Sequence, residues 1–338
     1  MACPACGYDN VDGAQFCERC GQPFGAPVDP AQVGATPAPA APEAPSWRSS
    51  TSTGTPCAGC GAANGFHDNY CDQCGRRRTA GLDRTTIDLG VIGGATDKGR
   101  RKAHNEDAFA IGRLGTTLAA VVCDGVSSSS QADLAALAAT EAGIASLLES
   151  LAGGASHQAA TEAAGLAAAE AAAKAGDPSQ PAPPSCTYVS ALVSPERVTI
   201  GWVGDSRAYW AGPDGARAVT VDDTIAGHLD AIDTPPDDHR YADPQAVALL
   251  RWLGADAPPA KPNIESWTPE GPGTVVVCSD GLSRYLAEPG DLLTLAPTGT
   301  PADRATTLVR YAVSSGGVDN IAVVVIPYPP PTEGDPAP

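Results

Sequence analysis

The sequence has little positive charge and no long uninterrupted apolar run. Its 338 residues carry 21 Lys and Arg against 39 Asp and Glu, a formal net charge of −18. A surface of this sign disfavours nonspecific binding to nucleic acid or anionic lipid. No positively charged start precedes an apolar core, and Asp133, Glu141 and Glu149 interrupt the Ala/Leu stretch near 132–151. We therefore expect neither a secretory signal nor a membrane span, and predict a cytoplasmic protein.

Aromatic residues are also scarce, at 5% of the chain, although hydrophobic residues reach 43%. Alanine supplies much of this apolar content, which predicts helices built from small residues. The length leaves room for two or three domains. Residues 26–56 are rich in Ala, Pro, Ser and Thr and predict a disordered linker, and the proline-rich residues 329–338 predict a disordered tail.

Cysteine, in contrast, is abundant and regularly spaced. Eleven cysteines without a secretory signal indicate metal ligands or free thiols rather than disulfides. Eight of them form two copies of Cys-x2-Cys-x10-Cys-x2-Cys, within residues 1–25 and 57–80: Cys3, Cys6, Cys17, Cys20, Cys57, Cys60, Cys71 and Cys74. Four thiolates without an open position are typical of a structural Zn²⁺ site, and each set predicts one such ion.

Redox dithiols or chance could explain one such pair, but two copies of identical spacing favour zinc. Both modules resemble the zinc-ribbon family, and each is too small to fold without its metal. Zinc ribbons can bind nucleic acid, yet Arg76-Arg77-Arg78 is the only basic cluster in these two modules. We therefore expect the modules to bind a protein partner or to be purely structural.

The rest of the chain alternates between helical and extended patterns. Residues 132–151 and 156–175 predict two Ala-rich helices, with Gly153-Gly154 between them. Apolar runs predict strands over 119–123, 187–193, 198–203, 275–278 and 321–326. Residues 211–274, with many Asp and Pro, are predicted to be irregular. Many antiparallel strands with a few helices predict an α+β fold in which helices cover the sheet faces.

Five short acidic motifs punctuate this region: Asn105-Glu106-Asp107, Asp124-Gly125, Gly204-Asp205-Ser206-Arg207, Ser279-Asp280-Gly281 and Asp319-Asn320. Two of their acids directly follow apolar runs, which puts a carboxylate at the rim of a sheet. Any one motif has an ordinary explanation, such as an Asp-Gly turn or an Asp helix cap. Several carboxylates brought together would repel one another and need a cation.

In this order, preceded by Thr96-Asp97-x-Gly99, the motifs resemble the metal-dependent serine/threonine protein phosphatase family, type 2C, over about 86–328. The resemblance implies a four-layer α-β-β-α sandwich of two antiparallel sheets flanked by helices, with two Mg²⁺ or Mn²⁺ ions at one edge. The implied metal ligands are Glu106, Asp107, Asp124, Gly125, Asp205, Asp280 and Asp319.

The resemblance also implies a role for each ligand. Asp124 would bridge the two ions, and Asp280 and Asp319 would complete the shell of one. The Gly125 carbonyl would serve the other ion, with Glu106 or Asp107 nearby, and Asp205 would help to hold a weaker third ion.

The chemistry agrees with this assignment, because oxygen ligands suit Mg²⁺ or Mn²⁺. Two such ions can activate a water for attack on phosphoserine or phosphothreonine, so no protein nucleophile is needed. No Ser-His-Asp or reactive-cysteine arrangement stands out, and Cys123 and Cys278 lie inside apolar runs. We expect phosphorylated protein substrates, among them targets of a Ser/Thr kinase, and a bacterial source.

The motifs depart from the family at the substrate side. The family has an arginine four residues before Glu106, where it binds the substrate phosphate; this chain has Lys102, with Arg101 beside it. Lysine holds phosphate as a point charge without the guanidinium fork, so weaker binding or rescue by a neighbouring arginine is predicted. Serines occupy 127–130, and no histidine follows Asp124 to protonate the leaving group. The alternative is a pseudophosphatase, an interaction module recruited through its zinc ribbons.

Overall fold

The computed structural model describes residues 1–11, 17–20, 24, 44–50, 73, 83–177, 179–258 and 261–331. It forms two compact units, Met1–Glu43 and Ala44–Pro338, which we describe separately. All four cysteines of the second repeat lie outside the described residues, as do residues 332–338 of the predicted tail.

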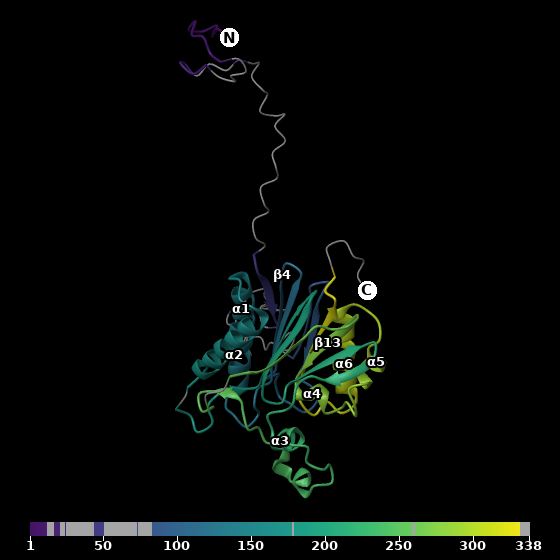
Figure 1. The fold of residues 1–338 in the computed structure, drawn as a ribbon. Coiled ribbons are helices and arrows are strands. Elements are labelled where there is room, and N and C mark those ends of the chain that lie inside the picture. Colours follow the sequence, from purple (N-terminus) through teal and green to yellow (C-terminus); the bar gives the residue numbers. More distant parts are fainter. Residues whose placement is uncertain are drawn as a thin grey trace. The chain divides into compact units, whose positions relative to one another are not determined.

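Two six-stranded antiparallel sheets form the centre of the larger unit (Figure 1), with strand orders β1-β4-β5-β7-β8-β12 and β10-β9-β13-β14-β3-β2. The first contains β1 (Ser46–Ser49), β4 (Ala108–Leu114), β5 (Thr117–Cys123), β7 (Tyr188–Ser194), β8 (Arg197–Val203) and β12 (Asn263–Trp267). The second contains β2 (Arg84–Asp88), β3 (Gly93–Asp97), β9 (Arg207–Gly212), β10 (Gly215–Ala218), β13 (Gly273–Cys278) and β14 (Ile321–Tyr328). A small pair, β6 (Ser185–Cys186) and β11 (Leu253–Gly254), lies beside them.

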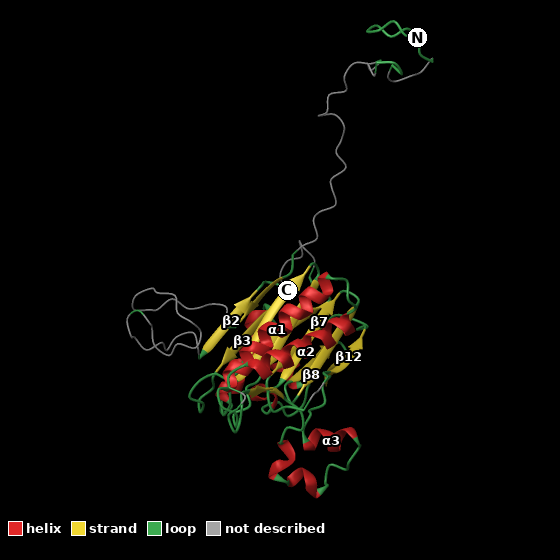
Figure 2. Cartoon of the chain, turned by 90° about the vertical axis from the view of Figure 1, so that its left-hand side faces the viewer, coloured by secondary structure: helices red, strands yellow, loops and turns green. Residues whose placement is uncertain are grey.

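Helices cover both outer faces. Helices α1 (Ala132–Ala152) and α2 (His157–Lys174) lie over the first sheet (Figure 2), while α4 (Asp280–Ser283), α5 (Asp291–Leu295) and α6 (Pro301–Ser314) pack on the second. One apolar core fills the space between the sheets, and one more lies under each helical layer. The predicted four-layer sandwich is confirmed.

Helix α1 is long and apolar enough, by length and composition, to cross a membrane. In this structure it packs against α2 and against β4 and β5. Its buried residues include Ile144, Leu147 and Leu148. The helix therefore contributes its apolar face to the core of the sandwich.

The predicted linker over 26–56 is wrong at 46–49. Strand β1 pairs antiparallel with β4 at the edge of the first sheet. Beyond it, Ser50 donates its backbone N–H to the Phe109 carbonyl at 2.7 Å, and its hydroxyl accepts from the Phe109 N–H at 3.1 Å. The sequence Ser-Trp-Arg-Ser has no apolar alternation, so its pairing depends on the exposed edge of β4 rather than on its own pattern. The larger unit therefore begins before the predicted boundary at 86.

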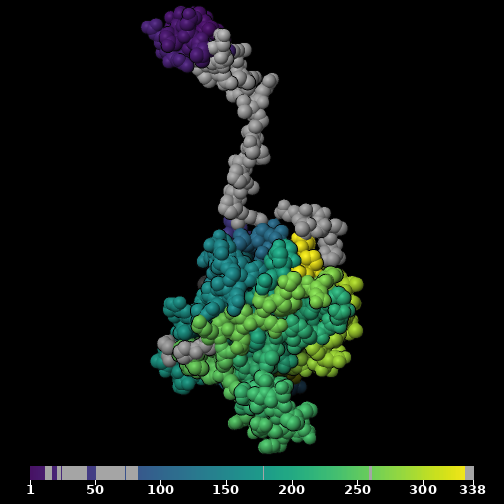
Figure 3. Space-filling view, viewed as in Figure 1, coloured from purple at the N-terminus to yellow at the C-terminus, as the bar shows by residue number. Residues whose placement is uncertain are grey.

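The segment over 211–274, expected to be irregular, contains several short elements. Besides β10 and β12 it holds α3 (Ile225–Ala231) and two 3₁₀ helices, His239–Ala242 and Pro244–Val247. Figure 3 shows the middle of this segment, in green, standing out from the lower end of the sandwich. Side-chain caps at Thr224, Asp238 and Asp243 begin its three helices.

Candidate metal centre

The acidic motifs come together at one edge of the sandwich, from both sheets. Strand β5 ends at Cys123, directly before Asp124, and β13 ends at Cys278, directly before Ser279 and Asp280. Strand β14 runs antiparallel to β13, so Asp319, just before β14, lies at the same edge. The end of an apolar strand thus fixes each acid in place.

Burial and mutual repulsion disfavour the charged forms of these acids. Burial raises the pKa of Asp124 well above its usual range, and the charges of Asp107, Asp280, Asp205 and Asp319 raise it further. Burial and the charges of Asp280 and Asp319 raise the pKa of Asp107 to about 8. Burial and the charge of Asp280 raise the pKa of Asp205 to about 7. Several acids that resist ionisation together mark a place for a cation.

Asp107 provides the most direct sign of a missing partner. Its Oδ2 accepts a 2.7 Å hydrogen bond from the Ser279 hydroxyl, while its Oδ1 is buried and has no hydrogen-bond partner among the described residues. Ser279 Oγ in turn accepts from the Ala322 N–H at 2.9 Å. A buried oxygen without a partner is costly unless an ion or water binds it.

Two glycines permit the close approaches that the site needs. A Cβ on Gly281 would lie 1.8 Å from the Asn320 carbonyl oxygen, so only glycine lets the segments carrying Asp280 and Asp319 meet. Gly204 has φ +102°, which favours glycine, and it turns the chain from β8 into Asp205. These glycines therefore have a structural role within their motifs.

Asn320 holds the loop that carries Glu106. Its Oδ1 accepts from the Glu106 N–H at 2.9 Å, and its Nδ2 donates to the carbonyls of Lys98 and His104, each at 2.9 Å. Asn320 belongs to the Asp319-Asn320 motif, but no role of its side chain could be predicted from the sequence. Its side chain links the first acidic motif to the last.

Two cations lie among the acids. Lys102 Nζ is 2.7 Å from Asp319 Oδ1 and 3.7 Å from Glu106 Oε2, and it also donates to the Ser127 hydroxyl. Partial burial lowers the pKa of Lys102, but the hydrogen bond and charge of Asp319 outweigh this and raise it. Lys102 therefore stays charged at the edge of the site.

The second cation is Arg284, for which the sequence predicted no role in the site. It lies four residues after Asp280, binds that carboxylate, and approaches Asp319 Oδ2 to 3.4 Å. The i,i+4 spacing on α4 is the signal that could have found it. Arg101, predicted as a possible phosphate ligand, is exposed and has no contact with these acids among those found in the described ranges. His104 is 3.4 Å from Glu106, with 63% of its side chain exposed.

The carboxylates fit a hard, open metal site better than a tight cage. In the described part of the chain, no oxygens from three different carboxylates lie within 4.8 Å of one another, so these side chains do not form a closed cage. Mg²⁺ and Mn²⁺ prefer such oxygen donors and keep several waters beside them. Cysteine chemistry is disfavoured because Cys123, Cys186 and Cys278 are fully buried, and burial raises the pKa of Cys278 to about 12.

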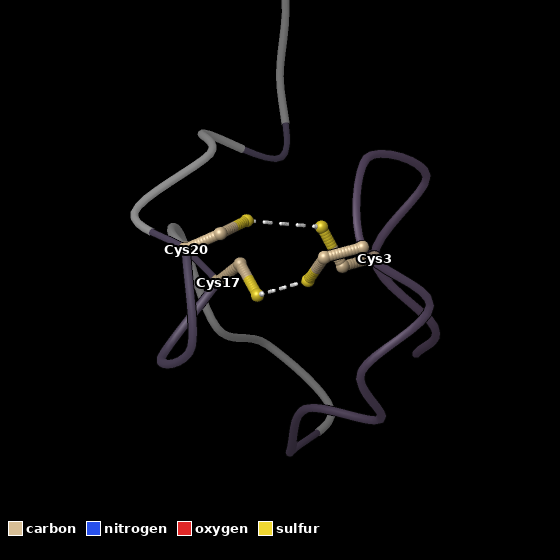
Figure 4. Close-up of side chains that lie close together, drawn as sticks. Cys3, Cys17 and Cys20 are labelled. Atoms are coloured by element: carbon tan, nitrogen blue, oxygen red, sulfur yellow. Dashed lines mark hydrogen bonds between the residues drawn. The ribbon is translucent and has the colours of Figure 1, made fainter.

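The first cysteine repeat forms a separate, compact ligand set (Figure 4). The sulfurs of Cys3, Cys6, Cys17 and Cys20 all lie within 4.8 Å of one another. Burial raises the pKa of Cys17, but the N–H groups of Cys20 and Arg19 and the Asn10 amide outweigh it and lower the value to about 6. Four cysteine sulfurs at this spacing fit one tetrahedral Zn²⁺.

Known protein families match both the cysteine repeats and the sandwich that carries the acids. The protein-family model "Double zinc ribbon" matches residues 3–75, and the model "Protein phosphatase 2C" matches residues 96–307. "Serine/threonine phosphatase stp" of Listeria innocua is 29% identical over 142 residues, which cover 41% of this chain and 55% of the relative. "Serine/threonine protein phosphatase PstP" of Mycobacterium tuberculosis is 28% identical over 141 residues, 41% of this chain and 26% of the relative. The chain thus spans about half the length of the first of these relatives.

Solved structures show the same fold. The M. tuberculosis phosphatase PstP/Ppp superimposes with a TM-score of 0.57 at 24% identity, covering 69% of this chain and 96% of that one. The PstP catalytic domain in complex with 2 manganese ions gives a TM-score of 0.56 at 22% identity, with 72% and 97% covered. Because the phosphatase match spans most of the chain, the chain belongs to the protein phosphatase 2C family.

Proposed function

We propose that this chain is a metal-dependent protein serine/threonine phosphatase that hydrolyses phosphoserine and phosphothreonine. The observation that carries the proposal is the gathering of buried carboxylates at one edge, more of them than Lys102 and Arg284 can pair with, and above all the oxygen of Asp107 that has no hydrogen-bond partner among the described residues. Membership of the phosphatase family supports the same chemistry.

We assign the acids to two Mn²⁺ or Mg²⁺ ions. Asp124, which has the other four aspartates around it, would bind both ions, and Asp280 and Asp319 would help to hold one of them. The Gly125 carbonyl with Glu106 or Asp107 would help to hold the other ion, and Asp205 is the candidate ligand of a third. When bound, such ions activate water for attack on a phosphoryl group and neutralise its charge.

The protein's own side chains prepare this centre. Ser279 orients Asp107, and Asn320 holds the backbone of Glu106. Lys102 lies close enough to the acids to bind a phosphate oxygen of the substrate. Arg101, exposed on the same loop, is a weaker candidate for that task. His104 is a candidate proton donor because it lies beside Glu106, although it is largely exposed.

The partners and location follow the same proposal. Phosphorylated proteins, including targets of a Ser/Thr kinase, are the proposed substrates. Each cysteine repeat would hold one structural Zn²⁺ and could dock a protein partner. The net charge of −18 disfavours nucleic acid as a partner and is consistent with a cytoplasmic enzyme.

The test uses the full chain and a phosphothreonine peptide. Phosphate release is measured with Mn²⁺ and with EDTA, beside an Asp280→Asn variant whose folding is checked by circular dichroism. We expect Mn²⁺-dependent release that the variant loses. If the folded wild-type protein releases no phosphate with Mn²⁺ or Mg²⁺, the proposal fails and the pseudophosphatase alternative gains support.

A further inference from the structure

The cleft that holds the acids has a second, apolar wall. One cavity of about 480 Å³ is lined by the proposed metal ligands Asp124 and Asp280 and also by Val247, Leu249 and Trp252. Val247 is the last residue of the 3₁₀ helix Pro244–Val247, and Leu249 and Trp252 come soon after it in the chain. We call Val247, Leu249 and Trp252 the apolar wall.

The apolar wall is only partly covered by the rest of the protein. Val247 has 74% of its surface accessible, and Leu249 and Trp252 are half-buried. Isolated exposed apolar residues are common on protein surfaces and need no explanation. The three residues of the apolar wall differ from such isolated residues, because they line the same cavity as the proposed metal ligands. A substrate bound there would cover them.

Backbone pairing makes the apolar wall part of the fold rather than a free loop. Leu249 forms a β-bridge with Thr224, and the Leu250 N–H donates to the Asp223 carbonyl at 2.7 Å. Trp252 donates its indole N–H to Asp256 at 3.0 Å. The wall is therefore positioned before a substrate arrives, which reduces the entropic cost of binding.

The charge in the cavity is of one sign. All charged residues that line it in the described ranges are aspartates: Asp124, Asp205, Asp256, Asp280 and Asp319. Metal ions would compensate the proposed ligands, but Asp256, which is exposed and accepts from the Trp252 indole, is not among those ligands. An acidic side chain placed against the apolar wall would meet this uncompensated charge.

We propose that the apolar wall is a specificity subsite for the residue that flanks the phosphorylated serine or threonine. It favours substrates with a bulky apolar neighbour and disfavours those with an acidic neighbour. The inference rests on the proposed phosphatase function and names the substrate class of that site. A single apolar contact in such a pocket is worth roughly 10-fold in kcat/KM.

The test compares three substrates of the full-length protein in Mn²⁺. Two phosphothreonine peptides differ only in carrying Leu or Asp on both sides of the phosphothreonine, and p-nitrophenyl phosphate has no flanking residues. We expect kcat/KM for the Leu peptide to exceed that for the Asp peptide by about 10-fold or more. Val247→Ser removes one apolar contact and leaves the charge of Asp256, so this ratio should fall by roughly several-fold. Val247 is 74% exposed, so the substitution should not disturb folding.

Leu293→Ser is the matched control, because Leu293 is a 40% exposed apolar residue on α5 that does not line the cavity. It should keep the wild-type ratio. Equal rates on both peptides, or an unchanged ratio in Val247→Ser, would overturn the subsite while hydrolysis of p-nitrophenyl phosphate still supports the phosphatase. Absence of hydrolysis of all three substrates overturns the phosphatase function, and the subsite with it.

Discussion

The four cysteines of the first repeat and the acids at the sandwich edge are both ligand sets, but they are built in opposite ways. The cysteines come from 18 consecutive positions, Cys3 to Cys20, and their sulfurs lie within 4.8 Å of one another. The acids come from segments between Glu106 and Asp319 and stay further apart. A closed thiolate set suits a structural ion, whereas an open carboxylate set leaves positions for water and substrate.

The largest effect is expected at the centre of the acid set. Asp124→Asn removes the charge that the other aspartates surround, so hydrolysis of p-nitrophenyl phosphate with Mn²⁺ should fall by more than about 100-fold, beyond the loss typical of an outer-shell change. Asp214→Asn, in the exposed turn between β9 and β10, is the control and should change little. Near-normal activity in Asp124→Asn would show that the acids are not the working centre.

The next effect concerns a residue that orients a ligand. Ser279→Ala removes the 2.7 Å hydrogen bond to Asp107 and the acceptor for the Ala322 N–H, so kcat or Mn²⁺ affinity should fall by about 10- to 100-fold. Ser266→Ala is the matched control, because Ser266 bonds Thr199 within the first sheet, away from the acids. Equal kinetics in the two variants would mean that Asp107 does not depend on this contact.

Metal-free protein should be less stable at high pH. Folding raises the pKa of Asp107 to about 8 and of Asp205 to about 7, above the 3.8 of an ordinary aspartate. The folded state therefore binds more protons than the unfolded state between about pH 4 and pH 8, and stability falls as pH rises through this window. In EDTA, the midpoint of thermal unfolding should drop between pH 5 and pH 8.

Mn²⁺ should reverse this trend, because it favours the ionised carboxylates and binds the folded state. The midpoint at pH 8 should then rise with Mn²⁺ concentration. A midpoint that neither falls with pH in EDTA nor responds to Mn²⁺ would argue against a cation-dependent acid cluster.

The smallest effect is expected for the cation inside the cluster. Arg284 competes with a metal ion for Asp280, and an ion pair of this exposure is worth up to about 1 kcal/mol. Arg284→Gln should therefore lower the Mn²⁺ concentration for half-maximal activity by about 2- to 5-fold. Arg310→Gln, on α6, should leave it unchanged. A higher Mn²⁺ requirement in Arg284→Gln would instead indicate that Arg284 supports the metal site.

Sequence predicted the features that repeat or follow strong apolar patterns. The Ala-rich helices appear as α1 and α2, and the acids stand at the ends of apolar strands as expected. Strand β1 could not be predicted, because its polar residues pair with an edge that exists only in the folded sheet. Short elements such as β12, partly exposed along its length, have too weak a pattern to detect.

The features of the site that could not be predicted depend on contacts between segments that are distant in the sequence. Arg284 looks like an ordinary helix-surface cation until α4 places it against Asp319. Asn320 gains its role only when its amide meets the loop of Glu106. The apolar wall has no sequence signal, because Val247 and Trp252 lie within a segment without regular periodicity.

The two predicted metal sites can be tested directly by anomalous scattering from crystals grown with Mn²⁺, with data collected at the manganese and zinc edges. We predict manganese peaks between Asp124, Asp280 and Asp319, and a zinc peak among Cys3, Cys6, Cys17 and Cys20. Manganese bound elsewhere, with no peak at the acid edge of an active preparation, would contradict the account.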